Sequence, residues 1–205
     1  LALAADAVST LREELPPASA SFLRRSSGPT TQLWQRRFDS ADCLLTRIGT
    51  GNKPWKPELE SRANPDLEDE VKEIYDAFEL KGAPLMANLN RGGVVGIVGD
   101  REGSLALARS LVTQLATHIG PADLTLGIFC DKGKEDDWGW ASWLPHTRQA
   151  GNVSGGRWMA SGRLQSTEML RGIHQTIEGV ITPAVVLVLD SEVLTEGRDA
   201  PARDL

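Results

Sequence analysis

Residues 93–118 read GVVGIVGDREGSLALARSLVTQLATH, and they set the expectation for the rest of the chain. An apolar run (93–98) is followed by a turn with two glycines and then by a helical pattern from Ser104 to His118. A strand, a glycine turn and a helix in this order open nucleotide-binding α/β domains, whose turn holds a phosphate at the helix N-terminus. The first question is whether this turn keeps that chemistry or only its shape.

The segments around this stretch predict an α/β fold. Strand-like apolar runs alternate with helical patterns from residue 84 to residue 190. We expect strands at 84–89, 93–98, 124–130, 156–161 and 184–190, and helices at 104–118, 135–144 and 166–179 with Ser166 as the N-cap of the last. The pattern predicts a doubly wound, mostly parallel sheet of P-loop NTPase-like (RecA/Rossmann-like) topology, in which strands 93–98, 124–130 and 184–190 are adjacent.

The sequence pattern before residue 32 predicts a helix and an extended arm that lie outside the core. A helical pattern (1–15) ends at two prolines, and a Ser/Pro/Gly-rich stretch (18–31) follows it. A short strand (43–51) and an amphipathic helix (66–80) lie before the predicted core. We therefore divide the chain into a helix and linker (1–32) and an α/β domain (33–205) with its core at about 84–190, and we expect the chain to be a fragment of a longer one.

Composition narrows the classes of function. The 205 residues carry a net charge of −6, which argues against direct binding of a nucleic-acid backbone. No apolar stretch approaches the ~18 residues of a membrane span, so we expect no membrane insertion by this segment. Cys43 and Cys130 lie in apolar runs, where buried, reduced thiols of a cytosolic protein are expected.

The glycine turn lacks the residues of a Walker A loop, G-x-x-x-x-G-K-[ST]. Counted from Gly99, the second glycine falls on Ser104 and the lysine on Leu105, and no lysine occurs between Lys81 and Lys132. The vestigial loop consists of Gly99, Asp100, Arg101, Glu102, Gly103 and Ser104. Its two carboxylates lie at the helix N-terminus, where they satisfy the helix dipole and repel an anion. We expect no nucleotide and no other cofactor to bind here.

A second half-match lies at the end of the strand AVVLVLD (184–190). Asp190 has the place of a Walker B aspartate, but Ser191 stands where an ATPase carries its catalytic glutamate. We favour a role for Asp190 in capping the following turn over a role in binding Mg²⁺. The three histidines lie on different predicted elements and, with two strand cysteines, make no zinc site. We therefore expect no metal and no catalytic residue in this chain.

A tryptophan cluster, WGWASWLPH (138–146), has two readings. Trp138, Trp140 and Trp143 lie within six residues, and the last two share a helix face. Packing against the sheet is the favoured interpretation, and a docking face for a neighbouring domain is the alternative. We expect Trp140 or Trp143 to leave part of its ring on the surface.

Four stretches together resemble one region of a known family. They are LWQRRFDSADCLLTRIGTG (33–51), residues 91–131, WGWASWLPH (138–146) and VLDSEVLTEGRDAPARDL (188–205). They are similar to the segment ahead of the first motor domain in actinobacterial FtsK/SpoIIIE-type ATPases. This group includes the EccC/EssC motors of type VII secretion and related FHA-linked proteins.

The resemblance implies an ATPase-like domain without a working nucleotide site. In that family the segment follows a membrane anchor and stalk and precedes the true ATPase domains, which use Mg-ATP. The resemblance implies that residues 1–15 end the stalk, that neighbouring ATPase domains of the same chain are partners, and that the parent forms a hexamer-like homo-oligomer. It also implies a cytoplasmic location at the inner face of the plasma membrane, through the parent protein.

Three functions remain open from the sequence. The first is a non-catalytic module that couples the stalk to ATP-driven motor domains of a translocase, or regulates them. The second is a nucleotide-binding enzyme domain in which Arg101 and Asp190 serve an atypical site. The third is a cargo- or protein-interaction module that uses the tryptophan cluster. The lysine-free, acidic loop favours the first.

Overall fold

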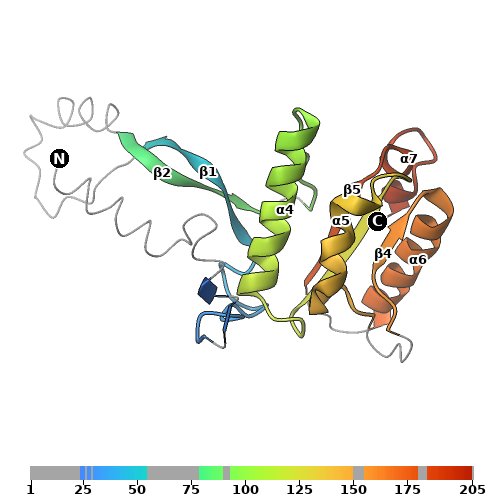
Figure 1. Cartoon of the computed structure of the whole chain (residues 1–205), viewed down its shortest axis with the longest axis horizontal. Helices are drawn as coiled ribbons and strands as arrows, with labels where there is room; N and C mark the ends of the chain where they lie inside the picture. Colours follow the sequence, from blue (N-terminus) through green and yellow to red (C-terminus); the bar gives the residue numbers. More distant parts are fainter. Residues whose placement is uncertain are drawn as a thin grey trace, which may run out of the picture. The chain divides into compact units, whose positions relative to one another are not determined.

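The computed structural model describes seven stretches of the chain, and Figure 1 shows their helices and strands. They are residues 24–25, 27–28, 30–54, 79–89, 93–149, 155–179 and 184–204. The helix expected at 1–15 lies outside them, as does the helix at 66–80 apart from its last two residues, which begin a strand. Two compact units make up the chain, Leu1–Gly28 with Leu44–Leu111 and Pro29–Cys43 with Val112–Leu205. The expected boundary between residues 32 and 33 stays a prediction.

The first unit contains a two-stranded antiparallel ribbon. Strand β1 (Leu45–Pro54) pairs with β2 (Glu79–Asn88), from Leu45 opposite Asn88 to Pro54 opposite Glu79. Irregularities interrupt the register at two places along β1, as is common in strongly twisted two-stranded ribbons. The strand expected at 43–51 is therefore confirmed. The strand expected at 84–89 also forms, but it pairs with β1 and not in the parallel sheet, which corrects the predicted core.

The strand expected at residues 93–98 is wrong. These residues are irregular and precede helix α4 (Arg101–His118), within which the division between the two units falls. The side chains of Val94 and Val98 are 87% and 99% exposed. An apolar run becomes a strand only when a neighbouring backbone accepts and donates its ladder bonds, and no described residue pairs with this run.

The second unit contains a parallel three-stranded sheet of order β4-β3-β5 (Figure 1). The central strand β3 (Leu124–Cys130) pairs in parallel with β5 (Ala184–Asp190) along its whole length and with β4 (Met159–Ser161) at its end. The strands at 124–130 and 184–190 are thus parallel neighbours, as their apolar runs predicted. The observed class is mixed α/β with a parallel sheet.

Helix α6 (Arg163–Gly179) contributes to a core beside this sheet. Its residues Leu170 and Ile173 are buried in one cluster with Phe129 of β3 and with Leu194. Gly127 of β3 permits this packing, since a Cβ there would lie 2.7 Å from Leu187 and 3.1 Å from Ile173. The register of helix and sheet therefore depends on one glycine in the central strand.

The helical segments begin and end differently from the sequence pattern. Helix α6 begins three residues before Ser166, which is buried inside the helix and is not its N-cap. The helix expected at 135–144 is split into α5 (Glu135–Trp138) and a 3₁₀ helix, η2 (Gly139–Trp143). Three short elements complete the unit, namely η3 (Pro145–Thr147), α7 (Glu192–Thr195) and η4 (Pro201–Asp204). Across the described ranges, every helix is too short or too polar to cross a bilayer.

Candidate functional site

The N-terminus of α4 is capped by the chain itself. The Asp100 carboxylate accepts a hydrogen bond from the backbone N–H of Gly103 at 2.8 Å. This is the geometry of a side-chain N-cap, in which an acidic oxygen satisfies the orphan amides and the positive end of the helix dipole. A phosphate at this turn would compete with the Asp100 carboxylate for the Gly103 amide.

Gly103 gives the Asp100 carboxylate room at the helix end. A Cβ at Gly103 would lie 3.1 Å from Oδ2 of Asp100, tighter than most real Cβ contacts. The glycine therefore lets the capping carboxylate approach the helix end. Residues 99–103 are exposed, and Ser104 is half-buried.

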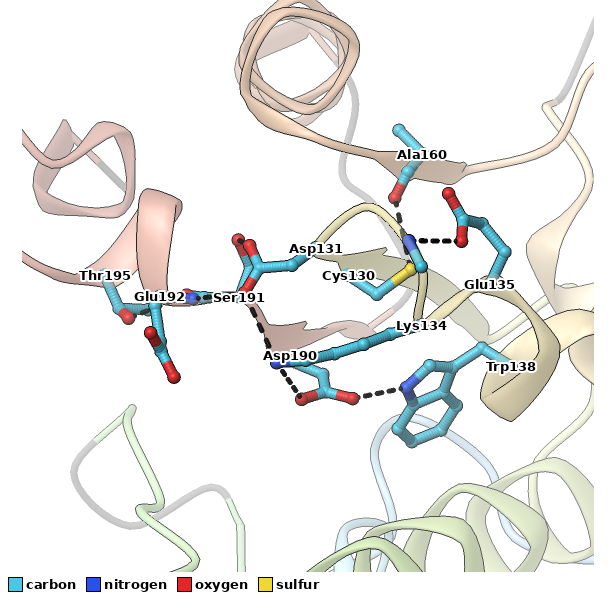
Figure 2. Close-up of polar contacts among 11 residues, drawn as sticks. Cys130, Asp131, Lys134, Glu135, Trp138, Ala160, Asp190, Ser191, Glu192 and Thr195 are labelled. Atoms are coloured by element: carbon cyan, nitrogen blue, oxygen red, sulfur yellow. Dashed lines mark hydrogen bonds and ion pairs between the residues drawn. The ribbon is translucent and has the colours of Figure 1, made fainter. Parts of the chain in front are cut away.

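The carboxyl ends of β3 and β5 carry the main polar cluster of the second unit (Figure 2). Asp131 follows β3, and its carboxylate accepts hydrogen bonds from the Ser191 hydroxyl at 2.6 Å and the Glu192 N–H at 3.0 Å. Partial burial raises the pKa of Asp131, but these two bonds and the Lys134 ammonium outweigh burial and hold the pKa below its ordinary value. Asp131 is therefore an ionised anchor that caps α7 from a different strand.

Asp190, the Walker B-like aspartate, is held by two other partners (Figure 2). Its Oδ2 accepts a hydrogen bond from the indole N–H of Trp138 at 2.9 Å, and its Oδ1 lies 3.8 Å from the Lys134 ammonium. Trp138 is 2% exposed, so this bond joins α5 to the end of β5 inside the unit. The Glu192 N–H, which opens α7, donates to Asp131, and the capping role expected for Asp190 stays a prediction.

In this cluster, the two carboxylates are therefore contacted by hydrogen-bond donors and a lysine of the same unit. Within the described ranges, no group of three or more His, Cys, Asp and Glu side chains is arranged to hold a metal ion. Cys130, at the end of β3, is a buried free thiol whose pKa is raised first by burial and then by nearby carboxylates. A raised pKa keeps the thiol protonated and unreactive. Cys43 is also buried and free, as expected.

The two stretches that partly match nucleotide-binding motifs fall in different units. Residues 99–104 belong to the first unit, and Asp190 belongs to the second with the polar cluster. Within the second unit, sequence reasoning assigned no site role to Asp131 or to Lys134. The available signal was the spacing of an acid and a lysine three residues apart at a strand end.

A second constellation gathers at the C-terminal end of α4. The backbone N–H groups of Trp34 and Arg36 donate to the carbonyls of Thr117 and His118, each at 2.9 Å. The Trp34 indole N–H donates to the carbonyl of Ala116, also at 2.9 Å. Three carbonyls at the end of a helix, which have no partner within it, are thus satisfied by one short segment.

Trp34 adopts a strained backbone to make these bonds. Its φ is 57°, the left-handed region, which costs a bulky residue about 1–2 kcal/mol. Arg36 is buried and forms an ion pair with Asp42 at 3.0 Å. Strain of this kind persists only where surrounding contacts fix the conformation. The hydrogen bonds to α4 supply them.

His146 brings the tryptophan-rich motif to the same helix end. Its Nε2 lies 2.8 Å from the Ile119 carbonyl, and its ring meets the Trp34 ring edge-on, with centroids 6.2 Å apart. A carbonyl only accepts, so Nε2 carries the hydrogen. Burial lowers the pKa of His146, and the bond to Ile119 offsets this only in part. We call Trp34, Arg36 and His146, with the carbonyls of residues 116–119 that they contact, the helix clamp.

The three clustered tryptophans have separate environments. Trp138 is buried on Asp190, which removes it from the proposed interface, and Trp140 is half-buried with its ring stacked on that of Trp138. Trp143 is 87% exposed. Surface exposure was expected at Trp140 or Trp143, and Trp143 has it.

The chain is similar to secretion-system proteins of several bacteria. It is 29% identical over 141 residues to the ESX-4 secretion system protein EccC4 of Mycobacterium tuberculosis, covering 64% of this chain and 11% of that protein. It is 29% identical over 124 residues to the ESX secretion system protein EccC of Geobacillus thermodenitrificans (57% and 8%) and 27% identical over 124 residues to YukB of Bacillus subtilis (56% and 8%). No family model matches the sequence.

The chain thus spans about a tenth of the length of these relatives. The similarity confirms the resemblance to EccC-type type VII secretion motors that the sequence motifs indicated.

Proposed function

We propose, from the homology to a segment of EccC-type secretion proteins, that this chain is a non-catalytic, ATPase-like module of a type VII secretion motor. In this proposal it couples the segment preceding residue 33 to ATP-driven motor domains elsewhere in the same parent protein. The sheet is a remnant of a doubly wound, P-loop-like fold. The chain itself binds no Mg-ATP and hydrolyses none, and the parent lies at the cytoplasmic face of the membrane as a hexamer-like assembly.

The helix clamp is the observation that carries the coupling role. Residues 34–36 follow the proposed stalk end and attach by three hydrogen bonds to the last carbonyls of α4. A force on the chain before residue 34 would therefore act on the end of the 18-residue helix α4 and not on a loop. Hydrogen-bonded, packed elements transmit such displacement because they deform little.

The internal occupation of both half-sites supports the non-catalytic part. Asp100 caps the helix end that would bind phosphate, and Asp190 is bonded to Trp138. A phosphate would compete with a carboxylate that is already in place, and Mg²⁺ would compete with an indole N–H and a lysine. An atypical enzyme site served by Arg101 and Asp190 is disfavoured on these grounds.

The experiment that tests coupling uses the full parent protein. Trp34→Ala removes the indole hydrogen bond and the ring contact with His146, and we expect it to lower secretion by the parent while the protein stays folded and membrane-associated. Phe38→Ala is the matched control, since Phe38 is an exposed aromatic in the same segment. Equal secretion by the wild type and Trp34→Ala would refute the coupling role of the clamp.

A docking face is a second candidate function, favoured by Trp143 alone. Trp143 is 87% exposed, which is unusual for so large an apolar side chain. Tryptophan is also a frequent anchor of protein interfaces. Trp143→Ala in the parent should reduce the interaction between this module and its neighbouring ATPase domain, measured by cross-linking. Unchanged cross-linking would remove this candidate and leave the coupling proposal standing.

A further inference from the structure

Lys134 occupies the position between the two strand-end carboxylates where a divalent cation would be expected. Its ammonium lies 3.3 Å from Oδ2 of Asp131 and 3.8 Å from Oδ1 of Asp190 (Figure 2). The side chains of Lys134, Asp131 and Asp190 are 31%, 19% and 15% exposed. A positive charge is thus placed between two largely buried carboxylates on neighbouring parallel strands.

The turn after β3 holds this ammonium in place. Gly133 adopts φ 88°, a left-handed conformation that a side chain would strain, and its N–H donates to the Glu135 carboxylate at 2.7 Å. The Lys134 N–H donates to the Asp131 carbonyl at 3.1 Å, which closes the turn. The lysine side chain is therefore directed back to the strand from which the turn departs.

Every oxygen of the two carboxylates has an internal partner. Asp131 accepts from Ser191 on one oxygen and from Glu192 and Lys134 on the other. Asp190 faces Trp138 with one oxygen and Lys134 with the other. Mg²⁺ and Ca²⁺ need such oxygens as ligands, and here one oxygen of each carboxylate faces the lysine.

Charge balance gives the lysine an additional role. Two carboxylates close together in a partly desolvated site repel each other unless a cation lies between them. One ammonium neutralises half of the pair's charge, and the hydrogen bonds from Ser191, Glu192 and Trp138 stabilise the remainder. Removing the lysine would leave a dianionic pair, and this is the electrostatic condition that attracts a divalent cation.

We infer that Lys134 is the resident counter-ion of this strand-end carboxylate pair: it ties β3 to β5 and excludes divalent cations from Asp131 and Asp190. The inference concerns these residues alone and holds whether or not the module couples a stalk to a motor. It assigns to Lys134 a positioning role that the family resemblance did not supply.

The test is terbium luminescence of the intact 205-residue chain. Tb³⁺ replaces Ca²⁺ at carboxylate sites and emits when a nearby indole is excited, and Trp138 touches Asp190 directly. We expect background emission from the wild type and a severalfold rise for Lys134→Met, which Ca²⁺ competes away. Lys134→Met with Asp190→Asn should return to background.

Two substitutions serve as controls. Lys134→Arg keeps the charge and should stay at background. Lys132→Met removes another lysine of the same turn. The Lys132 side chain lies against Gly162 and not between the carboxylates, so this variant should also stay at background. A wild type that binds Tb³⁺ as well as Lys134→Met, or a Lys134→Met protein that binds none, would overturn the inference.

Stability gives an independent readout in case the variant folds poorly. Lys134→Met and the more polar Lys134→Gln should both melt at a lower temperature than the wild type, and millimolar Ca²⁺ should raise their Tm but not that of the wild type. Loss of structure in both variants that Ca²⁺ does not reverse would also contradict the inference.

Discussion

Asp190 shows that a motif-like position does not specify the contacts of its side chain. The sequence presents it as the end of a Walker B-like strand, and in the structure its carboxylate contacts an indole N–H and a lysine. A hydrogen bond to a charged acceptor contributes about 1.5–3 kcal/mol. The contact with Trp138 is therefore expected to be among the stronger polar interactions of the second unit.

Trp138→Phe tests that contact. The ring volume is largely kept, while Asp190 loses its donor in a mostly buried position, so we expect a loss of about 1.5–3 kcal/mol in the free energy of unfolding. The measurement is urea denaturation followed by circular dichroism. Trp143→Phe is the matched control, because exposed positions change stability by about 0.5 kcal/mol at most. Equal stability of the two variants would show that the Trp138 bond contributes little.

His146 gives a prediction for pH dependence. Burial lowers its pKa in the folded chain, so between that value and the unfolded value of about 6.5 the unfolded chain binds more protons. The stabilisation is fully present above about pH 6.5 and declines as the pH falls below it. Thermal unfolding measured from pH 8 downward, at about half-unit steps, should show this decline.

His146→Gln is the matched variant, since its amide keeps a donor for the Ile119 carbonyl but does not titrate in this range. Its Tm should fall less steeply below about pH 6.5 than that of the wild type. His118, which is also buried, is present in both proteins, so the difference between the two curves isolates His146. Parallel curves would contradict a depressed pKa at this residue.

At the scale of elements, the helix clamp joins two sequence motifs that look unrelated. Trp34 and Arg36 come from the L-W-x-R-R stretch, and His146 comes from the end of the tryptophan-rich stretch. Both motifs meet at the last turn of α4, where carbonyls need donors. Trp34, Arg36 and His146 therefore contribute together to the capping of one helix end.

Trp34→Phe tests the clamp as an element. It keeps an aromatic ring and removes the N–H that donates to the Ala116 carbonyl, so we expect a loss of about 0.5–1.5 kcal/mol in unfolding free energy. Hydrogen exchange should show faster exchange at the Trp34 and Arg36 amides than in the wild type. Phe38→Leu, four residues after Trp34, should leave both quantities unchanged. A change as large as that of Trp34→Phe would contradict the clamp.

Strands with a continuous apolar run and a hydrogen-bonded neighbour followed most directly from the sequence. Strands β3 and β5 correspond to the runs LTLGIFC and AVVLVLD. The run at 93–98 is also apolar but has no partner among the described residues, because strand formation depends on a neighbour that composition does not specify. Helix α6 begins early because Gly162, at φ 72°, turns the chain out of β4 directly before it.

The contacts of the candidate site could not be predicted from the sequence. A missing lysine and two acids in the loop can be read from residues 99–104. The bonds from Trp138 to Asp190 and from His146 to Ile119 join residues 52 and 27 positions apart. No local spacing signals such pairs, since they arise only when the strands and helices pack.

At the scale of the whole molecule, the described residues form an antiparallel ribbon and a mixed α/β unit with a parallel sheet. The Asp100 carboxylate caps α4 in the first unit, and the Lys134 ammonium lies near two strand-end carboxylates in the second. The segment is about a tenth of its secretion-system relatives, and its role is proposed to be mechanical within them.

Isothermal calorimetry with Mg-ATP on the 205-residue chain tests the non-catalytic claim most directly. We predict no heat of binding for the wild type and none for Asp190→Ala. Thermal unfolding in saturating Mg-ATP should leave Tm unchanged, whereas a ligand at a hundred times its Kd would add about 2.7 kcal/mol of stability. Low-micromolar binding by the wild type that disappears in Asp190→Ala would contradict the account and indicate a working nucleotide site.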